Sequence, residues 1–258
     1  MSAIDLEGVI NFRDFGGAPA GVGRRVRTGR LYRSGHHATA TEADLGRLAE
    51  LDFALIVDLR RPPERARDPA RRPASSRAQV LEHKGPEAQA TPPHLAFLAQ
   101  PDASPDLVTR QMIVGYRGYP FDPHYIAVYR EYFGLLGEID GPVMINCHAG
   151  KDRTGFLCAL TLYTLGVHRD DILADYLETN RHNRADERMA EMMEQFARNN
   201  GHPASEALLR RMMAADAAYL EAAFAEIEAQ HGSVDAYLSE VVGMSTARRD
   251  ALRERLVA

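Results

Sequence analysis

A cysteine and an arginine six positions further along the chain lie where a short strand is expected to give way to a helix. Residues 142–155 have the sequence Pro-Val-Met-Ile-Asn-Cys-His-Ala-Gly-Lys-Asp-Arg-Thr-Gly. This pattern predicts a buried strand over 143–146, a tight loop that begins at Cys147, and a helix that starts near Thr154. A loop this short can turn successive backbone N–H groups inward and so form a concave site for a tetrahedral oxyanion. Arg153 returns opposite the sulfur, where its planar guanidinium can bind two oxygens of that anion.

The loop also favours a reactive form of the cysteine. Cys147 would face the positive end of the helix dipole and the loop amides, which favour the thiolate, a nucleophile. Gly150 relieves the tight turn because glycine adopts a positive φ without steric cost. The alternative is a buried, inert thiol with an unrelated arginine downstream. The glycine and the strand–loop–helix context argue against that alternative.

These residues carry a resemblance to a known family. Cys-His-Ala-Gly-Lys-Asp-Arg-Thr-Gly resembles the active-site loop of the cysteine-dependent phosphatases of the protein tyrosine phosphatase superfamily. The Lys-Asp pair is similar to the atypical bacterial branch, whose members act on phosphotyrosine, phosphoserine/threonine and phosphoinositides. Two N-terminal runs, Asn-Phe-Arg-Asp-Phe-Gly-Gly (11–17) and Leu-Tyr-Arg-Ser-Gly (31–35), resemble motifs of that branch. Many tyrosine phosphatases place His before the nucleophile, whereas this chain has Asn146.

The resemblance implies phosphate monoester hydrolysis in two steps through a phosphocysteine. Cys147 would attack phosphorus while Arg153 and the loop amides hold the equatorial oxygens. Thr154 is expected to donate a hydrogen bond to the departing thiolate, and Lys151 to add charge for a second phosphate or an acidic substrate. The residues expected to bind the substrate are His148, Ala149, Gly150, Lys151 and Asp152.

Two aspartates compete for the role of general acid. Residues 53–60 form a continuous apolar run that ends in Asp58, which is typical of a parallel strand covered on both faces. Ligands collect at the carboxyl ends of such strands, and an Asp-Leu-Arg segment carries the proposed acid in the family that this chain resembles. Asp152, inside the loop, is the rival. The structural alternatives are that Asp58 caps or pairs with Arg60 or Arg61, and that Asp152 orients the substrate ring or pairs with a neighbouring arginine.

The fold class expected is α/β, a mostly parallel central sheet flanked by helices, in a single phosphatase domain over 1–258. Residues 62–107 hold nine of the fourteen prolines, which predicts an irregular, Pro/Arg-rich surface segment. Residues 184–228 contain methionines at helical spacing, and some relatives are similar in carrying a two-helix lid over the catalytic loop. Either a mobile lid or a plain core-packing hairpin fits this pattern.

For the N-terminal motifs, Arg13, Asp14 and Arg33 are interpreted as structural ion-pairing residues beneath the loop, with substrate contact as the alternative. Cys158 is interpreted as a buried packing thiol, with a redox partner for Cys147 as the alternative. The ten histidines show no metal-ligand spacing, so neither a metal nor a cofactor is expected.

Composition narrows the remaining function classes. A net charge of −5 argues against a general nucleic-acid binder, because such binding depends on Lys and Arg neutralising phosphates. No secretory signal and no membrane-spanning run is evident, so a cytoplasmic protein is expected, with export that leaves no N-terminal mark still open. The expected partner is a phosphorylated protein or phosphoinositide substrate, and the oligomeric state stays open. Two alternatives remain: a catalytically weak phosphate-binding module, suggested by Asn146, and a different cysteine chemistry such as sulfur transfer or arsenate reduction.

Overall fold

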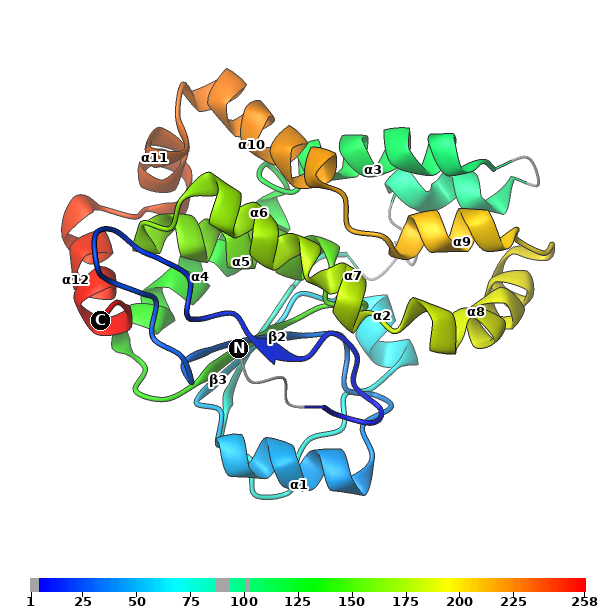
Figure 1. Ribbon diagram of the computed structural model, residues 1–258, viewed down its shortest axis with the longest axis horizontal. Coiled ribbons are helices and arrows are strands. Elements are labelled where there is room, and N and C mark those ends of the chain that lie inside the picture. Colours follow the sequence, from blue (N-terminus) through cyan, green and yellow to red (C-terminus); the bar gives the residue numbers. More distant parts are fainter. Residues whose placement is uncertain (1–4, 87–92, 101–102) are drawn as a thin grey trace.

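The computed structural model describes residues 5–86, 93–100 and 103–258, and a five-stranded sheet lies at its centre (Figure 1). The strand order is β1-β2-β5-β3-β4, with β1 antiparallel to β2 and the other neighbours parallel. The strands are β1 (Arg13–Asp14), β2 (Leu31–Ser34), β3 (Leu55–Asp58), β4 (Gln79–Glu82) and β5 (Val143–Asn146).

Helices cover both faces of this sheet (Figure 1). The first six helical elements are α1 (Glu42–Leu51), α2 (Pro62–Arg67), the 3₁₀ helix η1 (Pro93–Ala99), α3 (Pro105–Gly118), α4 (Pro123–Glu138) and α5 (Asp152–Leu165). Then come α6 (Arg169–Leu177), α7 (Thr179–His182), α8 (Ala185–Asn200), α9 (Glu206–Met213), α10 (Ala217–His231), α11 (Val234–Tyr237), the π-helix η2 (Leu238–Val242) and α12 (Thr246–Leu256). The predicted α/β class with a mostly parallel sheet is confirmed.

Alternate residues of the strands face two different apolar clusters. Ile56 and Met144 belong to a small cluster beneath α1, whereas Val57 and Ile145 belong to the large cluster that includes α4 and α5. Side chains alternate with a period of two along a strand, so the face on which each strand-end residue lies is set by these core positions. This alternation decides which polar groups at the carboxyl edge of the sheet can meet.

The segment 62–107 is more ordered than its composition suggests. It contains α2, β4, η1 and the start of α3, while residues 87–92 and 101–102 lie outside the described residues. Pro62 and Pro105 occupy first-turn positions of α2 and α3. A first-turn residue needs no N–H for the helix ladder, so proline starts a helix there instead of breaking one.

The range 184–228 divides into parts with different packing. Helices α8 and α9 form a helical pair at one edge of the molecule, and α9 packs on α3 (Figure 1). Helix α10 begins inside the same range, yet its Tyr219 and Phe224 are fully buried in the main core. A lid could therefore comprise α8 and α9 but not α10, and the lid itself stays a prediction.

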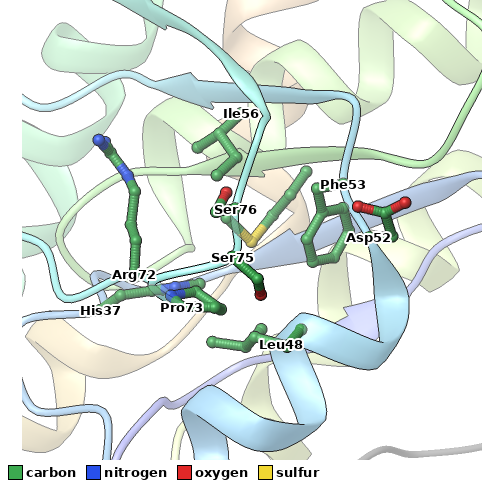
Figure 2. A pocket seen from close by; sticks show the side chains of 11 residues that line it. His37, Leu48, Asp52, Phe53, Ile56, Arg72, Pro73, Ser75 and Ser76 are labelled. Carbon is green, nitrogen blue, oxygen red and sulfur yellow. The ribbon is translucent and has the colours of Figure 1, made fainter.

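A small cavity lies between α1 and the sheet (Figure 2). Its walls include His37, Leu48, Phe53 and Met144, and its volume is about 20 Å³. That is room for about one water molecule. The cavity lies on the α1 side, with Met144, and is too small for a phosphate ester.

Candidate active site

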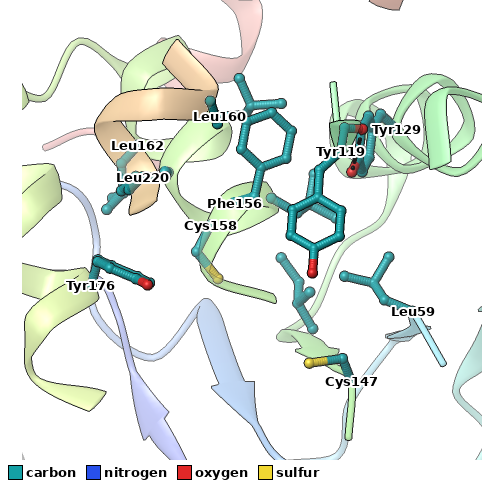
Figure 3. Close-up of a cluster of buried hydrophobic side chains, with 14 of the residues drawn as sticks. Leu59, Tyr119, Tyr129, Cys147, Phe156, Cys158, Leu160, Leu162, Tyr176 and Leu220 are labelled. Carbon is teal, nitrogen blue, oxygen red and sulfur yellow. Dashed lines mark hydrogen bonds between the residues drawn. The ribbon is translucent and has the colours of Figure 1, made fainter. Parts of the chain in front are cut away.

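Cys147 follows β5 directly and lies at the base of a loop whose carbonyl groups point outward. The cysteine is 2% exposed, and Figure 3 shows it at the end of its strand. The His148 carbonyl accepts from the backbone N–H of His36 at 3.0 Å. The Gly150 carbonyl accepts from Asn11 Nδ2 at 2.7 Å and from Arg33 at 3.0 Å. In a trans peptide the next N–H points away from the carbonyl, so the amides that follow these two residues point into the loop.

Gly150 is required by two features of the loop. Its φ is +67°, as the sequence predicts for the tight turn. A Cβ at this position would lie 2.4 Å from the backbone of Ser34. A side chain here would therefore both strain the turn and push the loop off β2.

Arg153 is held by a glutamate that sequence reasoning missed. Its Nη1 and Nη2 donate to the two oxygens of Glu64 at 2.6 and 2.8 Å, and Nη1 also donates to the Leu59 carbonyl at 3.3 Å. Among the described residues, these contacts use three of the five guanidinium N–H groups. The side-on pair, Nε–H and the second Nη2–H, remains for two oxygens of an anion.

Glu64 links this arginine to the start of α2. Its carboxylate also accepts from the backbone N–H of Arg61 at 2.9 Å, the N-cap position of that helix. Burial would raise the pKa of Glu64, but the Arg153 charge and hydrogen bonds outweigh burial and lower that pKa to about 2. The signal available in the sequence was the capping spacing Arg-Pro-Pro-Glu.

Asp58 lies on the opposite face of the sheet from Cys147. Asp58 is two residues after Ile56 on the same strand, so its side chain lies on the same face of the sheet, the face that α1 covers. Its carboxylate is 1% exposed. Arg60 binds both oxygens, at 2.9 Å from Nε and 2.7 Å from Nη2. Asn146 Nδ2 adds a hydrogen bond at 3.2 Å. The structure thus shows the ion pair that the sequence offered as the alternative to a catalytic role.

Asp152 opens helix α5 on the cysteine side, and its side chain is 23% exposed. Tyr116 Oη donates to Asp152 Oδ1 at 2.9 Å, and Lys151 Nζ lies 3.4 Å from the same oxygen. The Lys151 amine is buried and donates to the carbonyls of Met212 and, at 3.3 Å, Ala214. The lysine predicted to bind substrate is therefore joined here to the end of α9 and to the residue that follows it.

The N-terminal motifs support the loop from beneath. Arg33 Nη1 pairs with Asp175 at 2.6 Å, and Arg13 donates to the Asp175 carbonyl at 2.9 Å. Both arginines are fully buried. Arg13 Nε also lies 3.6 Å from Asp175 Oδ1, so the ion-pairing interpretation holds for both arginines. Asp14 instead accepts from the backbone N–H groups of Gly16 and Gly29.

Two further groups lie under the loop, on α5. Thr154 is fully buried, and its hydroxyl has no hydrogen-bond partner among the described residues. That leaves the hydroxyl able to donate to a nearby acceptor. Burial raises the pKa of the Cys158 thiol to about 12, so this thiol is protonated at neutral pH (Figure 3).

Tyrosines from α3 and α6 surround the catalytic loop, and their roles were not evident from the sequence. Tyr119 points its hydroxyl toward Cys147 (Figure 3). Tyr116 contacts Asp152, and Tyr176 contacts Tyr116. In the sequence, the aromatic residues of 107–136 recur at helical spacing, which favours core packing and leaves open that one or two line the mouth of the pocket.

A cysteine under inward-pointing amides, with an arginine fixed beside it, defines the class of cysteine-dependent phosphatases. Comparison with known proteins gives the family. The model of the tyrosine phosphatase family matches residues 4–258, so this chain belongs to that family and is a phosphatase.

Two relatives cover nearly all of the chain. A Cupriavidus necator protein, assigned by its name to the tyrosine-protein phosphatases, is 36% identical over 93% of this chain and 84% of its own length. The triple specificity protein phosphatase PtpB of Mycobacterium tuberculosis is 31% identical over 98% of both chains. Within the described residues, every helix is too short or too polar to cross a membrane.

Proposed function

We propose that this phosphatase hydrolyses phosphotyrosine, and also phosphoserine, phosphothreonine and phosphoinositides, through a phosphocysteine on Cys147. The outward hydrogen bonding of the loop carbonyls carries the proposal, because it turns the amides toward the space above the sulfur. Arg153 adds a side-on pair of N–H groups to the same space. The name of the M. tuberculosis relative, a triple specificity phosphatase, supports a substrate range wider than phosphotyrosine.

The reaction proceeds by two in-line displacements. In the first, the Cys147 thiolate forms the S–P bond as the ester P–O bond breaks, and Asp152 gives its proton to the leaving oxygen. In the second, the Asp152 carboxylate takes a proton from water, the new P–O bond forms and the S–P bond breaks. Thr154 Oγ1 donates a hydrogen bond to the thiolate as it leaves. The nucleophile, the anion ligands and the acid all come from the protein.

We assign the general acid to Asp152 because of where the two aspartates lie. A general acid must come within hydrogen-bond reach of the leaving oxygen. Asp152 is partly exposed at the loop, on the same side as Cys147. Asp58 lies on the α1 face with both oxygens bound by Arg60. The role of Asp58 as acid stays a prediction that the variant experiments below test.

Access to the cysteine requires a movement of the cover. Cys147 and Lys151 are both buried, and Lys151 is bound to the carbonyls of Met212 and Ala214, so we infer that this segment withdraws before a phosphoprotein binds. We propose that α8 and α9 act as the lid. Lys151 holds the chain at the end of α9 in this closed arrangement, and its charge becomes available to a second phosphate when that chain withdraws.

The test is hydrolysis of 4-nitrophenyl phosphate in EDTA by the wild type and by Cys147→Ser. We expect turnover by the wild type, none by the variant, and one phosphoryl group on Cys147 after rapid acid quench, detected by mass spectrometry. Cys158→Ser is the matched control and should keep its activity. A panel of phosphopeptides and short-chain phosphoinositides then ranks the substrates.

The contrary outcome has a definite meaning. If the wild type binds vanadate but turns over none of these substrates, the chain is a phosphate-binding module. Asn146, at the position where many tyrosine phosphatases have histidine, is the residue that keeps this second function under consideration.

A further inference from the structure

Three hydroxyl and carboxyl groups from three helices form one hydrogen-bonded chain that ends on Asp152. Tyr176 Oη of α6 lies 2.7 Å from Tyr116 Oη of α3, and Tyr116 Oη lies 2.9 Å from Asp152 Oδ1. A carboxylate oxygen only accepts, so the Tyr116 Oη–H donates its hydrogen bond to Asp152, and the Tyr176 Oη–H donates to Tyr116 Oη. Both tyrosines are buried, which removes water as a competing partner.

The far end of this chain is fixed by packing against the catalytic helix. A Cβ on Gly155 would lie 2.8 and 2.9 Å from two carbons of the Tyr176 ring. The ring therefore rests directly on the backbone of α5, one turn after the loop. The absence of a side chain at Gly155 lets Tyr176 approach closely enough to orient Tyr116.

Tyr116 can orient Asp152 through a hydrogen bond, but it does not itself serve as the general acid. Burial, with the adjacent Asp152 charge, raises the pKa of Tyr116 well above its usual value. The phenol consequently keeps its proton at neutral pH and remains a donor. Its contact falls on Oδ1, the oxygen that Lys151 also faces at 3.4 Å. Two cationic or donating groups on one oxygen leave Oδ2 as the oxygen that carries a transferable proton.

We propose that Tyr116 is a positioning residue for catalysis: it fixes the Asp152 carboxyl so that Oδ2 delivers the proton to the leaving oxygen, and Tyr176 fixes Tyr116. This inference rests on the proposed role of Asp152 as general acid. It adds that the acid is held by a tyrosine chain from α3 and α6, two helices outside the catalytic motif.

Leaving-group dependence separates a positioning role from a structural one. Loss of a well-placed acid slows esters with poor leaving groups, such as phenyl phosphate, far more than esters with good ones, such as 2,4-dinitrophenyl phosphate. We expect Tyr116→Phe to lower kcat/KM for phenyl phosphate about tenfold, the effect of losing one hydrogen bond to a charged group. The effect on kcat/KM for 2,4-dinitrophenyl phosphate should be less than about twofold, because kcat/KM reports the first step, in which the leaving group departs. Tyr176→Phe should show the same pattern, more weakly.

The matched control is Tyr132→Phe. Tyr132 is also fully buried, and its hydroxyl pairs with Thr161 Oγ1 at 3.0 Å, away from Asp152. This variant should change neither ester. If Tyr116→Phe behaves like Tyr132→Phe, or slows both esters equally, the positioning role is wrong.

Asp152→Asn distinguishes this failure from failure of the mechanism. It should show a larger leaving-group-dependent loss than Tyr116→Phe, and the double variant should lose no more than Asp152→Asn alone. If Asp152→Asn shows the dependence and Tyr116→Phe does not, the tyrosine inference alone is overturned. If Asp152→Asn shows no such dependence, the acid assignment and the tyrosine inference both fall.

Discussion

The two faces of the sheet at its carboxyl edge carry similar residues and use them differently. On the α1 face, Asp58 binds Arg60 and Asn146, and every one of these side chains is buried and paired. On the α5 face, Arg153 keeps its side-on N–H pair, and Asp152 keeps one oxygen uncommitted among the described contacts.

This difference between the two faces shows which side of the sheet keeps polar groups available for a substrate. On the α1 face, Arg60 binds both oxygens of Asp58, and Asn146 joins β5 to β3 through the same carboxylate, so this carboxylate is used for structure. The reactive groups lie on the α5 face. There Asn11 and Arg33 bind the outward-pointing Gly150 carbonyl of the catalytic loop, and the inward-pointing N–H groups of the loop remain for a substrate anion. Variants on the α5 face should therefore reduce activity, while variants on the α1 face should reduce stability.

The largest expected effect is on the α5 face. Cys147→Ser should lower kcat for 4-nitrophenyl phosphate on the order of a million-fold, as removal of a catalytic nucleophile does. Thermal unfolding should change little, since the substitution is nearly isosteric. A stopped assay with wild type spiked at trace level sets the detection limit. Activity close to wild type would remove the nucleophile from this face and contradict the comparison.

The next effect belongs to the α1 face. Asp58→Asn leaves the buried Arg60 charge without its partner, which should lower the free energy of unfolding by about 3–5 kcal/mol in urea titrations. The double variant Asp58→Asn, Arg60→Met removes that charge and should recover part of the loss. The kcat of the folded fraction should stay within about twofold of wild type. A stable but slow Asp58→Asn enzyme would reverse the assignment of the two faces.

Glu64 lies between these cases, because it is a structural carboxylate bound to a catalytic arginine. Its pKa of about 2 lies below the ordinary value of 4.5, so its contribution is complete above pH 4.5 and is lost as the pH falls toward 2. At pH 7, Glu64→Gln should cost up to about 3 kcal/mol of unfolding free energy. The difference from wild type should shrink between pH 4.5 and 2. Glu131→Gln, at an exposed site of α4, is the control and should show no such window.

The smallest effect concerns the proposed lid. Lys151→Met removes the bonds to the carbonyls of Met212 and Ala214. Hydrogen exchange across 206–216 should become about tenfold faster, the loss of roughly one hydrogen bond of local protection. Helix α10 should keep its protection because its apolar face lies in the core. Unchanged exchange in 206–216 would show that the lysine does not hold the closed arrangement.

Short sequence patterns predicted the local structure around Cys147, but they did not predict which face of the sheet each strand-end residue occupies. Strand, loop and helix around Cys147, the positive φ of Gly150 and the parallel sheet all follow from short patterns. The shared position of Asp58 and Cys147 at the ends of buried strands predicts one crevice, but a continuous apolar run hides the period-two alternation that places Asp58 on the other face.

Side-chain contacts between distant segments of the chain could not be predicted from the sequence either. Glu64 reaches Arg153 across 89 positions of sequence, and Tyr116 reaches Asp152 across 36. Neither pair has a spacing rule, since both depend on how helices dock against the sheet. The extent of the lid stays a prediction for a related reason: the break between α9 and α10, at 214–216, contains neither proline nor glycine to mark it.

The most direct test of this account is the pH dependence of kcat/KM for phenyl phosphate in Asp152→Asn and Asp58→Asn. A general acid produces the falling basic limb of the profile, because the rate drops as the acid loses its proton. We predict that Asp152→Asn lowers kcat/KM about 10²–10⁴-fold and loses the basic limb, while Asp58→Asn keeps that limb. If Asp58→Asn loses the limb and Asp152→Asn retains it, the acid lies on the α1 face and the division between the two faces is wrong.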